Sequence, residues 1–298
     1  MIISDLALQI NNSRIYGNAE CEIECLNLCN RDTRFEHILS YVVDDSWGSI
    51  VNENRSVCAL MCREEDAAIY LPIVSERNGA IIVCRQPERD FYELHEKLCS
   101  YGEFYQGFGF SAQVGRECRI ADSAIIENGV IIGNNVKIGS NTFIGRGTKL
   151  DEGVMIGNNC SVGANGFQII KVNGIPRNVT HVGGVHIGRN SYIGDNVCIS
   201  RSLFEGYTEL GANVMIDNLI HIAHNCIIGD NAVITAGCVL CGTSTIEKGA
   251  WLGTNTTVLN RVVVGYDSLV GIGSVVTRDI TKGTIAYGNP ARIARSNK

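Results

Sequence analysis

Two histidines, His221 and His224, lie close together in the chain and could act on a bound substrate. An imidazole can take up a proton near neutral pH, so either one is a candidate general base. Gly242 follows further along the chain and leaves its backbone N–H without a side chain beside it. A base next to such an N–H suits acyl transfer, because the base deprotonates the attacking group and the N–H holds the oxyanion. His224 and Gly242 would lie side by side only if the chain made one full turn between them.

The chain has a repeat that would bring it back in this way. Branched aliphatic residues or leucine recur every six residues over most of the stretch from Val114 to Val276. A small residue often follows each of them, and Asn, Asp or Gly often takes the fourth position, where left-handed backbone angles are needed. Hexapeptide repeats predict a parallel β-helix, in which three repeats form one triangular coil of about 18 residues. We therefore predict a mainly β protein, a left-handed parallel β-helix with coils about 5 Å apart.

In this frame His224 occupies the third position of its repeat, at a corner of the coil with its side chain outward. Gly242 stands three repeats later and thus one coil away. The column that contains both residues continues through Asn260 and Arg278 at the same interval. A guanidinium at the far end of such a column could hold a phosphate group.

Composition limits the kinds of partner. The chain has 298 residues and a net charge of −6, so we expect no nucleic-acid partner. It has neither a stretch of roughly 18 apolar residues nor a signal peptide, so we expect a cytoplasmic protein without membrane insertion. The 13 cysteines are scattered and odd in number, which argues against a disulfide framework. Cys238 and Cys241 are expected to fill the coil rather than to bind metal, because no second pair stands at zinc spacing.

The N-terminal part of the chain, residues 1–105, lacks the six-residue pattern. An apolar run at Ala80–Cys84 is followed by a helical pattern at Pro87–Leu98. These elements predict a small α/β domain.

The β-helix is expected over residues 106–280, with one interruption at 168–186 and a second at 201–209. Insertions into solenoids project as surface loops and often line a binding face. Residues 281–298 are expected to leave the coil as a C-terminal tail.

The segment from Asp217 to Asn225 resembles the D-N-x-x-x-I-A-H-N segment of UDP-3-O-acylglucosamine N-acyltransferases, which are enzymes of lipid A synthesis. Gly163–Phe167 is similar to the G-A-N-G-F element of the same family. The resemblance implies that His224 is the general base and that Gly242 is the oxyanion donor.

The same resemblance implies how the acceptor binds. Asn165 and Phe167 match the sugar-site positions of the G-A-N-G-F element, although Asn165 equally fits the turn role of a fourth-position Asn. Asn218 belongs to the segment around the base and is a further candidate for substrate binding. Aromatic residues of the family's N-terminal domain stack on uracil, and the nearest candidates here are Tyr41 and Trp47. The N-terminal domain is therefore expected to bind a nucleotide-linked amino sugar.

The chain departs from this family in several places. It has Asn260 and Arg261 where the family has a second histidine, and it has His221 where the family usually has Gln. We expect His221 to orient the substrate or to assist proton transfer. The C-terminal segment, which includes Gly-Asn-Pro-Ala-Arg, resembles that of coenzyme A-dependent sugar acetyltransferases and implies a coenzyme A site. The candidate residues of that site are Asn260, Gly271, Gly273, Arg278 and Arg292.

The favoured hypothesis is an N-acyltransferase that moves a short acyl group from acyl-coenzyme A to a nucleotide-linked amino sugar, with no metal. The alternatives are a lipid A N-acyltransferase that uses acyl carrier protein, and a sugar O-acetyltransferase. A γ-class carbonic anhydrase with zinc on three histidines and a purely structural solenoid are disfavoured, because neither accounts for the motifs. Since proteins of this class resemble trimers with active sites between prisms, we expect a homotrimer.

Overall fold

The computed structural model describes residues 1–31, 33–101, 104–105 and 107–297, and it divides the chain into two compact units. The N-terminal unit comprises Met1–Gln106, Gln168–Val182 and Phe204–Gly206, and the coil unit comprises Gly107–Phe167, Gly183–Leu203 and Tyr207–Lys298. Within the described part of the chain, no helix has the length and apolar character needed to cross a membrane.

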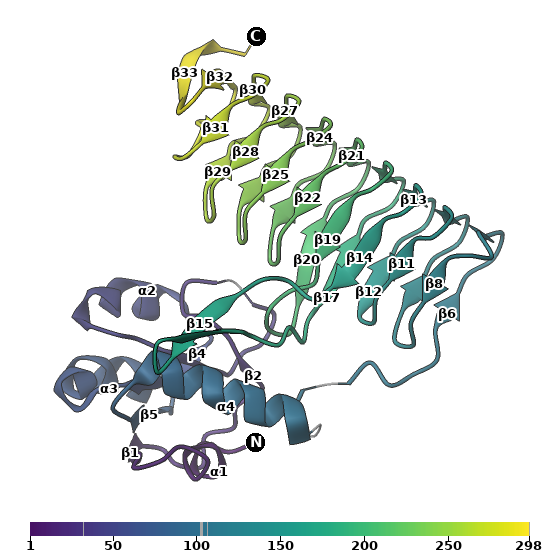
Figure 1. The fold of residues 1–298 in the computed structure, drawn as a ribbon. Helices are drawn as coiled ribbons and strands as arrows, with labels where there is room; N and C mark the ends of the chain where they lie inside the picture. The colour runs from purple at the N-terminus through teal and green to yellow at the C-terminus, as the bar shows by residue number, and fades with distance from the viewer. Residues whose placement is uncertain (32, 102–103, 106, 298) are drawn as a thin grey trace. The chain divides into compact units, whose positions relative to one another are not determined.

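The N-terminal unit is built on a five-stranded sheet in the order β1-β5-β4-β3-β2, in which β1 is antiparallel to its neighbour β5 (Figure 1). Its elements are α1 (Ile3–Ala7), β1 (Arg14–Gly17), β2 (Cys25–Leu26), β3 (Ile38–Tyr41), η1 (Asp45–Trp47), α2 (Gly48–Glu53), β4 (Val57–Cys62), η2 (Glu64–Asp66), α3 (Ala67–Ser75), β5 (Ala80–Val83), α4 (Pro87–Tyr101), β15 (Ile169–Val172) and β16 (Ile175–Asn178). β4 and β5 are buried along their whole length, as parallel strands covered by helices are. The apolar run predicted from the sequence is β5, and the predicted helical pattern is α4.

The first interruption of the repeat is not a surface loop of the coil. Its strands β15 and β16 form an antiparallel hairpin that belongs to the N-terminal unit. Thr180, just after the hairpin, donates from its N and Oγ1 to the carboxylate of Glu96 on α4, at 2.7 and 2.8 Å. Its carbonyl oxygen lies 2.8 Å from Nε2 of His95 on the same helix. The insertion is also shorter than the predicted 168–186, because Gly184 already begins a strand of the coil.

The coil unit winds through three sheets, drawn from teal to yellow in Figure 1, whose strands are parallel except for the last strand of the second sheet. The first sheet contains β6 (Gln113–Val114), β9 (Ile131–Ile132), β12 (Thr148–Leu150), β17 (Gly184–Ile187), β20 (Tyr207–Leu210), β23 (Ile227–Ile228), β26 (Thr245–Ile246) and β29 (Val263–Val264). The second contains β7 (Arg119–Ile120), β10 (Lys137–Ile138), β13 (Met155–Ile156), β18 (Tyr192–Ile193), β21 (Met215–Ile216), β24 (Val233–Ile234), β27 (Trp251–Leu252), β30 (Leu269–Val270), β32 (Thr284–Gly288) and β33 (Ala291–Ser296). The third contains β8 (Ile125–Ile126), β11 (Phe143–Ile144), β14 (Ser161–Ala164), β19 (Cys198–Ser200), β22 (His221–Ile222), β25 (Val239–Leu240), β28 (Thr257–Val258) and β31 (Val275–Val276).

The predicted six-residue pattern is confirmed by the register of the strands. Ile138 pairs with Ile156, three repeats later, and the repeat aliphatics from Ile132 onward are buried in one continuous core. The corners turn through left-handed residues, as predicted, because the chain must change direction there without a clash at Cβ. These residues include Asn135, Asn141, Asn159, Asn190, Asn196, Asn213, Asn225, Asn231, Asn255 and Asp267. Cys238 is buried in the same core, which confirms its filling role.

Residues 281–298 do not leave the coil, contrary to the sequence prediction of a tail. Ile280 still bridges to Val264, and β32 extends the second sheet by pairing with β30. β33 then folds back antiparallel to β32. Ala286 and Ala291 are buried in the coil core, so the C-terminal segment closes this end of the core instead of projecting from it.

Candidate active site

His224 lies in the turn between β22 of the third sheet and β23 of the first sheet, an edge that we call the His224 edge. The residue is only 7% exposed, which corrects the sequence expectation of an outward corner residue. The ring is covered because it packs against the next coil. A Cβ placed on Gly242 would lie 2.9 Å from both Cε1 and Nε2 of the imidazole. The predicted contact between His224 and Gly242 is therefore confirmed, and it depends on the glycine having no side chain.

Asn225 determines which nitrogen of the His224 ring carries the proton. Its Oδ1 accepts a hydrogen bond from the backbone N–H of Leu203 at 3.1 Å, which identifies this atom as the oxygen of the amide. Nδ1 of His224 lies 3.0 Å from the same oxygen. An amide oxygen cannot donate, so Nδ1 must be the donor in this contact. In the neutral ring, Nε2 then carries the lone pair that a general base requires.

The backbone at Gly242 presents a donor beside that lone pair. The neighbouring N–H groups are used within the coil, since Cys241 donates to Val258 and Thr243 donates to the carbonyl of His224, each at 3.0 Å. No described residue accepts a backbone hydrogen bond from the N–H of Gly242. Thr243 has a φ of 64°, which is rare for a β-branched residue and costs of the order of 1–3 kcal/mol. The backbone is therefore strained next to the candidate oxyanion donor.

Three other residues predicted from the sequence lie on the His224 edge. The pairing of Leu240 with Val258, and of Val258 with Val276, places Asn260 and Arg278 in line after Gly242. Both are exposed. Asn165 lies on the same edge in an earlier coil than His224, and it is also exposed. Its φ is not positive, so the alternative role as a left-handed turn residue is wrong.

Sequence analysis did not single out Arg201, which stands next to His224 on the other side from Gly242. Ile199 pairs with Ile222, so Arg201 matches His224 one coil earlier. The residue is 8% exposed, its Nε donates to the carbonyl of Gly163 at 2.7 Å, and burial lowers the pKa of its guanidinium. The coil between Arg201 and His224 is longer than three repeats. Counting three regular repeats back from His224 therefore gives a different residue from Arg201. Only the pairing of the strands could reveal Arg201.

Several predicted residues lie on a different edge, between the second and third sheets. Oδ1 of Asn218 accepts from the backbone N–H of Asp195 at 2.7 Å, a contact that stacks one coil on the next. A Cβ on Gly271 would lie 2.8 Å from Cβ of Tyr287, so close packing accounts for that glycine. Gly273 has a φ of 66° and open space around it. The structure therefore does not bring Gly271 and Gly273 together with the His224 edge, and their role at a coenzyme A site stays a prediction.

The remaining predicted residues of the coil unit are exposed. His221 points outward from β22, and partial desolvation by neighbouring atoms lowers its pKa. Phe167 is 80% exposed. Arg292 extends from β33, where its Nη1 donates to the carbonyl of Ala291. Their roles in substrate and coenzyme binding stay predictions.

Tyr41 and Trp47 both lie in the N-terminal unit, but Tyr41 is already packed against other side chains. Its ring centroid is 5.0 Å from that of Phe91, its hydroxyl donates to Glu88 at 3.1 Å, and burial raises its pKa. Trp47 is half-buried at the end of η1. Stacking of either ring on a base stays a prediction.

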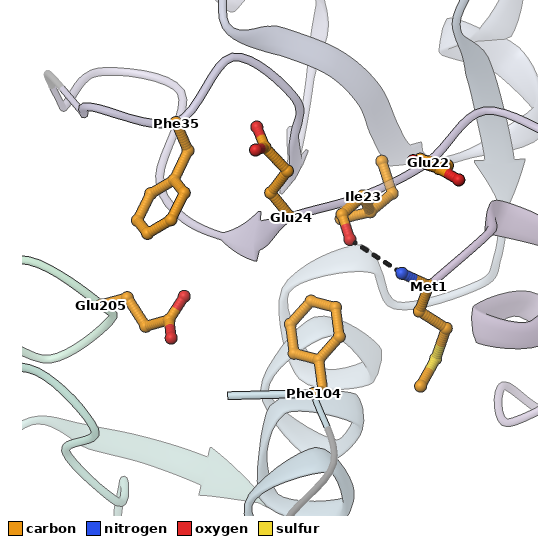
Figure 2. A pocket seen from close by; sticks show the side chains of 7 residues that line it. All are labelled: Met1, Glu22, Ile23, Glu24, Phe35, Phe104 and Glu205. Carbon is orange, nitrogen blue, oxygen red and sulfur yellow. Dashed lines mark hydrogen bonds between the residues drawn. The ribbon is translucent and has the colours of Figure 1, made fainter. Parts of the chain in front are cut away.

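The N-terminal unit has a pocket of about 270 Å³ that neither Tyr41 nor Trp47 lines. Figure 2 shows the rings of Phe35 and Phe104 on two sides of it, with the carboxylate of Glu205 directed towards it. The complete lining is Met1, Glu22, Ile23, Glu24, Phe35, Phe104 and Glu205.

His186 is held between two carboxylates on the outer side of the first sheet. Nδ1 lies 2.9 Å from Oε2 of Glu209, and Nε2 lies 3.1 Å from Oδ2 of Asp151. The hydrogen bond to Glu209, followed by the other contacts with both acids, raises the pKa of His186. Over the residues that the structure describes, no group of three His, Cys, Asp or Glu side chains could hold a metal ion.

Part of the chain is similar to a known family and to several known proteins. The chain matches the model described as bacterial transferase hexapeptide (six repeats) over residues 111–146, 135–166 and 207–242. It is 48% identical over 52 residues to the dTDP-3-amino-3,6-dideoxy-alpha-D-galactopyranose 3-N-acetyltransferase of Aneurinibacillus thermoaerophilus, a match that covers 17% of this chain and 27% of that protein. It is 29% identical over 121 residues to the galactoside O-acetyltransferase of Escherichia coli (strain K12), a match that covers 40% of this chain and 58% of that protein. The matched part of the chain thus spans less than two thirds of the length of each of these relatives.

Two solved structures share the fold. The UDP-N-acetylglucosamine acyltransferase of Francisella novicida has a TM-score of 0.52 and 25% identity, over 62% of this chain and 69% of that one. The UDP-N-acetylglucosamine acyltransferase of Bacteroides fragilis has a TM-score of 0.52 and 24% identity, over 65% of this chain and 72% of that one. Together with the repeat, these similarities confirm the predicted left-handed parallel β-helix.

Proposed function

Because this chain is a hexapeptide-repeat protein that carries the bacterial transferase repeat, we propose that it is an N-acyltransferase. It transfers a short acyl group from acyl-coenzyme A to the amino group of a nucleotide-linked amino sugar. The observation that carries the proposal is the position of Nε2 of His224 beside Gly242, with Nδ1 directed at Asn225. The similarity to a sugar 3-N-acetyltransferase supports an amine as the acceptor.

The proposed reaction has one tetrahedral intermediate. The sugar amine attacks the thioester carbonyl, a C–N bond forms, and Nε2 of His224 takes a proton from the attacking nitrogen. The N–H of Gly242 donates to the oxyanion that develops on the carbonyl oxygen. The C–S bond then breaks, and the electron pair leaves on the sulfur of coenzyme A. A thiolate is a good leaving group, so the step needs no strong acid beyond the histidine.

A second pocket of the N-terminal unit suits the phosphates of a nucleotide sugar. It has a volume of about 670 Å³ and lies beyond the carboxyl ends of β4 and β5, where α/β sheets usually bind their ligands. Arg14, Arg63 and Arg85 line it together with Glu64 and Glu65. Arg14 forms an ion pair with Glu64 and Arg63 with Glu65, so Arg85 is the candidate for binding phosphate. Replacing Arg85 with alanine is expected to raise the KM for the nucleotide sugar by about tenfold, the effect of losing one charged hydrogen bond. Steady-state kinetics check this, and an unchanged KM would remove the pocket from the proposal.

A donor and acceptor panel tests the function as a whole. Purified protein is mixed with acetyl-, longer acyl- and hydroxyacyl-coenzyme A, or with an acyl carrier protein thioester, and thiol release is measured with nucleotide-linked amino sugars. We expect turnover with a short acyl-coenzyme A. Turnover with the carrier-protein thioester alone would identify a lipid A-type enzyme. Turnover with sugars that offer a hydroxyl in place of the amine would favour an O-acetyltransferase, the second candidate, which the similarity to galactoside O-acetyltransferase supports.

We also propose that the protein is a homotrimer. The outward residues of the second sheet form an apolar row across seven paired strands, and a row of this kind favours association. The row consists of Met155, Tyr192, Met215, Val233, Trp251, Leu269 and Ile285. Light scattering should give three times the chain mass of 32.3 kDa, and a mass of one chain would exclude the trimer.

A further inference from the structure

Charged side chains gather on the outer side of the first sheet at the place where both insertions return to the coil. The coil resumes at Gly183 after the first insertion and at Tyr207 after the second, so β17 and β20 are the first strands after them. β12 is the last strand of this sheet before either insertion, and the three strands lie side by side (Figure 1). His186 of β17 pairs with Lys149 of β12 on one side and with Glu209 of β20 on the other.

The contacts between these three strands span more chain than a regular coil does. His186 contacts Asp151, 35 residues away, and Glu209, 23 residues away, whereas a regular coil has about 18 residues. Closing a longer connection costs more conformational entropy. The outward positions of the other strands in this sheet hold uncharged residues, namely Gln113, Ile131, Ile227, Thr245 and Val263. The charged contacts are therefore found where the coil is lengthened.

Both ring nitrogens of His186 face carboxylate oxygens. Nδ1 lies 2.9 Å from Oε2 of Glu209, and Nε2 lies 3.1 Å from Oδ2 of Asp151, the residue directly after β12. An ionised carboxylate only accepts hydrogen bonds, so both nitrogens must donate. A neutral ring has one N–H and would direct a lone pair at one of the two acids. The two contacts together therefore require the doubly protonated, positively charged ring.

Two further titratable side chains reach this cluster from the neighbouring strands. Nζ of Lys149 is 3.5 Å from Oδ1 of Asp151, so this acid contacts two cations. The ring of Tyr207 lies edge-on to the imidazole, with centroids 5.9 Å apart. The side chain of His186 is 24% exposed, so solvent screens the cluster only in part. The hydrogen bond to Glu209 is the largest cause of the raised pKa of His186, and it outweighs desolvation, which acts in the opposite direction.

We propose that His186, Asp151 and Glu209 form a pH-sensitive clasp that holds β12, β17 and β20 together where the insertions return to the coil. The clasp is closed while the imidazole carries both protons. When the ring loses one proton, its lone pair faces a carboxylate, that contact opens, and β17 loosens from the strand on that side. The clasp belongs to the coil itself, so it does not rest on the proposed function.

The direction of the pH dependence follows from the raised pKa of His186. Its pKa in the folded protein lies above that in the unfolded chain, where it is about 6.5. The clasp therefore stabilises the coil fully below pH 6.5 or so, and this stabilisation is lost as the pH rises through the folded pKa.

A titration of the histidine rings by nuclear magnetic resonance, on the full chain, is the first test. The chain has six histidines, and the signals of His186 are assigned by their loss in His186→Gln. We expect its midpoint to lie above about 6.5, and to fall in Glu209→Gln and in Asp151→Asn, because each variant removes one of the facing negative charges. A wild-type midpoint at or below that value would overturn the clasp, and this measurement holds even if His186→Gln folds poorly.

Hydrogen exchange is the second test, because it reports on the strands themselves. The N–H of Gly188 donates to Leu210 at 2.7 Å across β17 and β20, and that of Asp151 donates to Ile187 at 2.9 Å across β12 and β17. At pH 6 both are expected to exchange about fivefold faster in His186→Gln than in the wild type, and at a pH well above the folded pKa the two proteins should exchange equally. Comparing both proteins at one pH cancels the intrinsic pH dependence of exchange.

Two controls separate the clasp from a general loosening of the coil. The N–H of Gly229 donates to Ile246 at 2.7 Å on a regular coil of the same sheet, and its exchange should be the same in both proteins. In Asp151→Asn/Glu209→Gln, adding His186→Gln should have no pH-dependent effect, because the charges that it interacts with are absent. Equal exchange at Gly188 and Asp151 at every pH, or an equal change at Gly229, would overturn the proposal.

Discussion

Replacing His224 with asparagine is expected to lower kcat for acyl transfer by about 100- to 10,000-fold, the usual contribution of a positioned general base. Asparagine can still donate from its amide nitrogen to Oδ1 of Asn225, the contact that Nδ1 makes in the wild type at 3.0 Å. It has no group that accepts a proton at neutral pH. The variant therefore removes the base and keeps the local hydrogen bond. Thiol release from acyl-coenzyme A at saturating acceptor is the measurement.

The effect should be confined to the chemical step. The KM values are expected to change little, because a group that works only in the transition state contributes little to substrate binding. His37 offers a control, since its side chain is exposed in the N-terminal unit and has no part in the proposed site. His37→Ala should retain wild-type turnover. Retention of more than a third of wild-type kcat by His224→Asn would exclude His224 as the base.

Replacing Gly242 with alanine is expected to lower kcat by about 100- to 1,000-fold, comparable with the loss of an oxyanion donor. The added Cβ would lie 2.9 Å from Cε1 and Nε2 of His224, closer than such atoms approach, so the ring must move. Asn225 holds the opposite side of that ring. The methyl group would also occupy the space beside the N–H of Gly242. One methyl therefore disturbs both the base and the oxyanion donor.

The same variant should leave the fold intact. Gly242 does not have a positive φ, and the nearest atoms to its added Cβ belong to a side chain rather than to backbone. Gly253 is the contrasting variant, because a Cβ there would lie 2.7 Å from the backbone N of Ile272. Gly253→Ala is expected to destabilise the protein by about 1–3 kcal/mol, as overpacking does. Thermal unfolding of both variants checks the contrast, and an equal loss of stability in Gly242→Ala would assign its effect to folding.

The parts of the structure that the sequence predicts are those that repeat. A buried aliphatic every six residues and a left-handed Asn, Asp or Gly at the corners determine the coil, because each coil contacts mainly its neighbours. The contact of His224 with Gly242 follows from that regularity, since the two residues are separated by one regular coil. The pairing of Leu240 with Val258 extends the same column to Asn260.

The parts that sequence analysis missed involve insertions. The hairpin of β15 and β16 belongs to the N-terminal unit through Glu96 and His95, which no local pattern indicates. Arg201 neighbours His224 because the coil that contains it is lengthened by an insertion. Asn165 fits the fourth position of a repeat by its residue type, but its backbone is not left-handed.

The sequence by itself determined the β-helix, the contact of His224 with Gly242 and the resemblance to acyltransferases, because these depend on residue type and regular spacing. Only the tertiary structure decided which residues meet across the lengthened coils, since Arg201 lies next to His224 through the pairing of Ile199 with Ile222. It also decided that the imidazole of His224 is buried and that its Nδ1 carries the proton. The physical reason is that the tautomer of the ring is set by the amide oxygen of Asn225, and the backbone N–H of Leu203 identifies that oxygen across a spacing that follows no repeat.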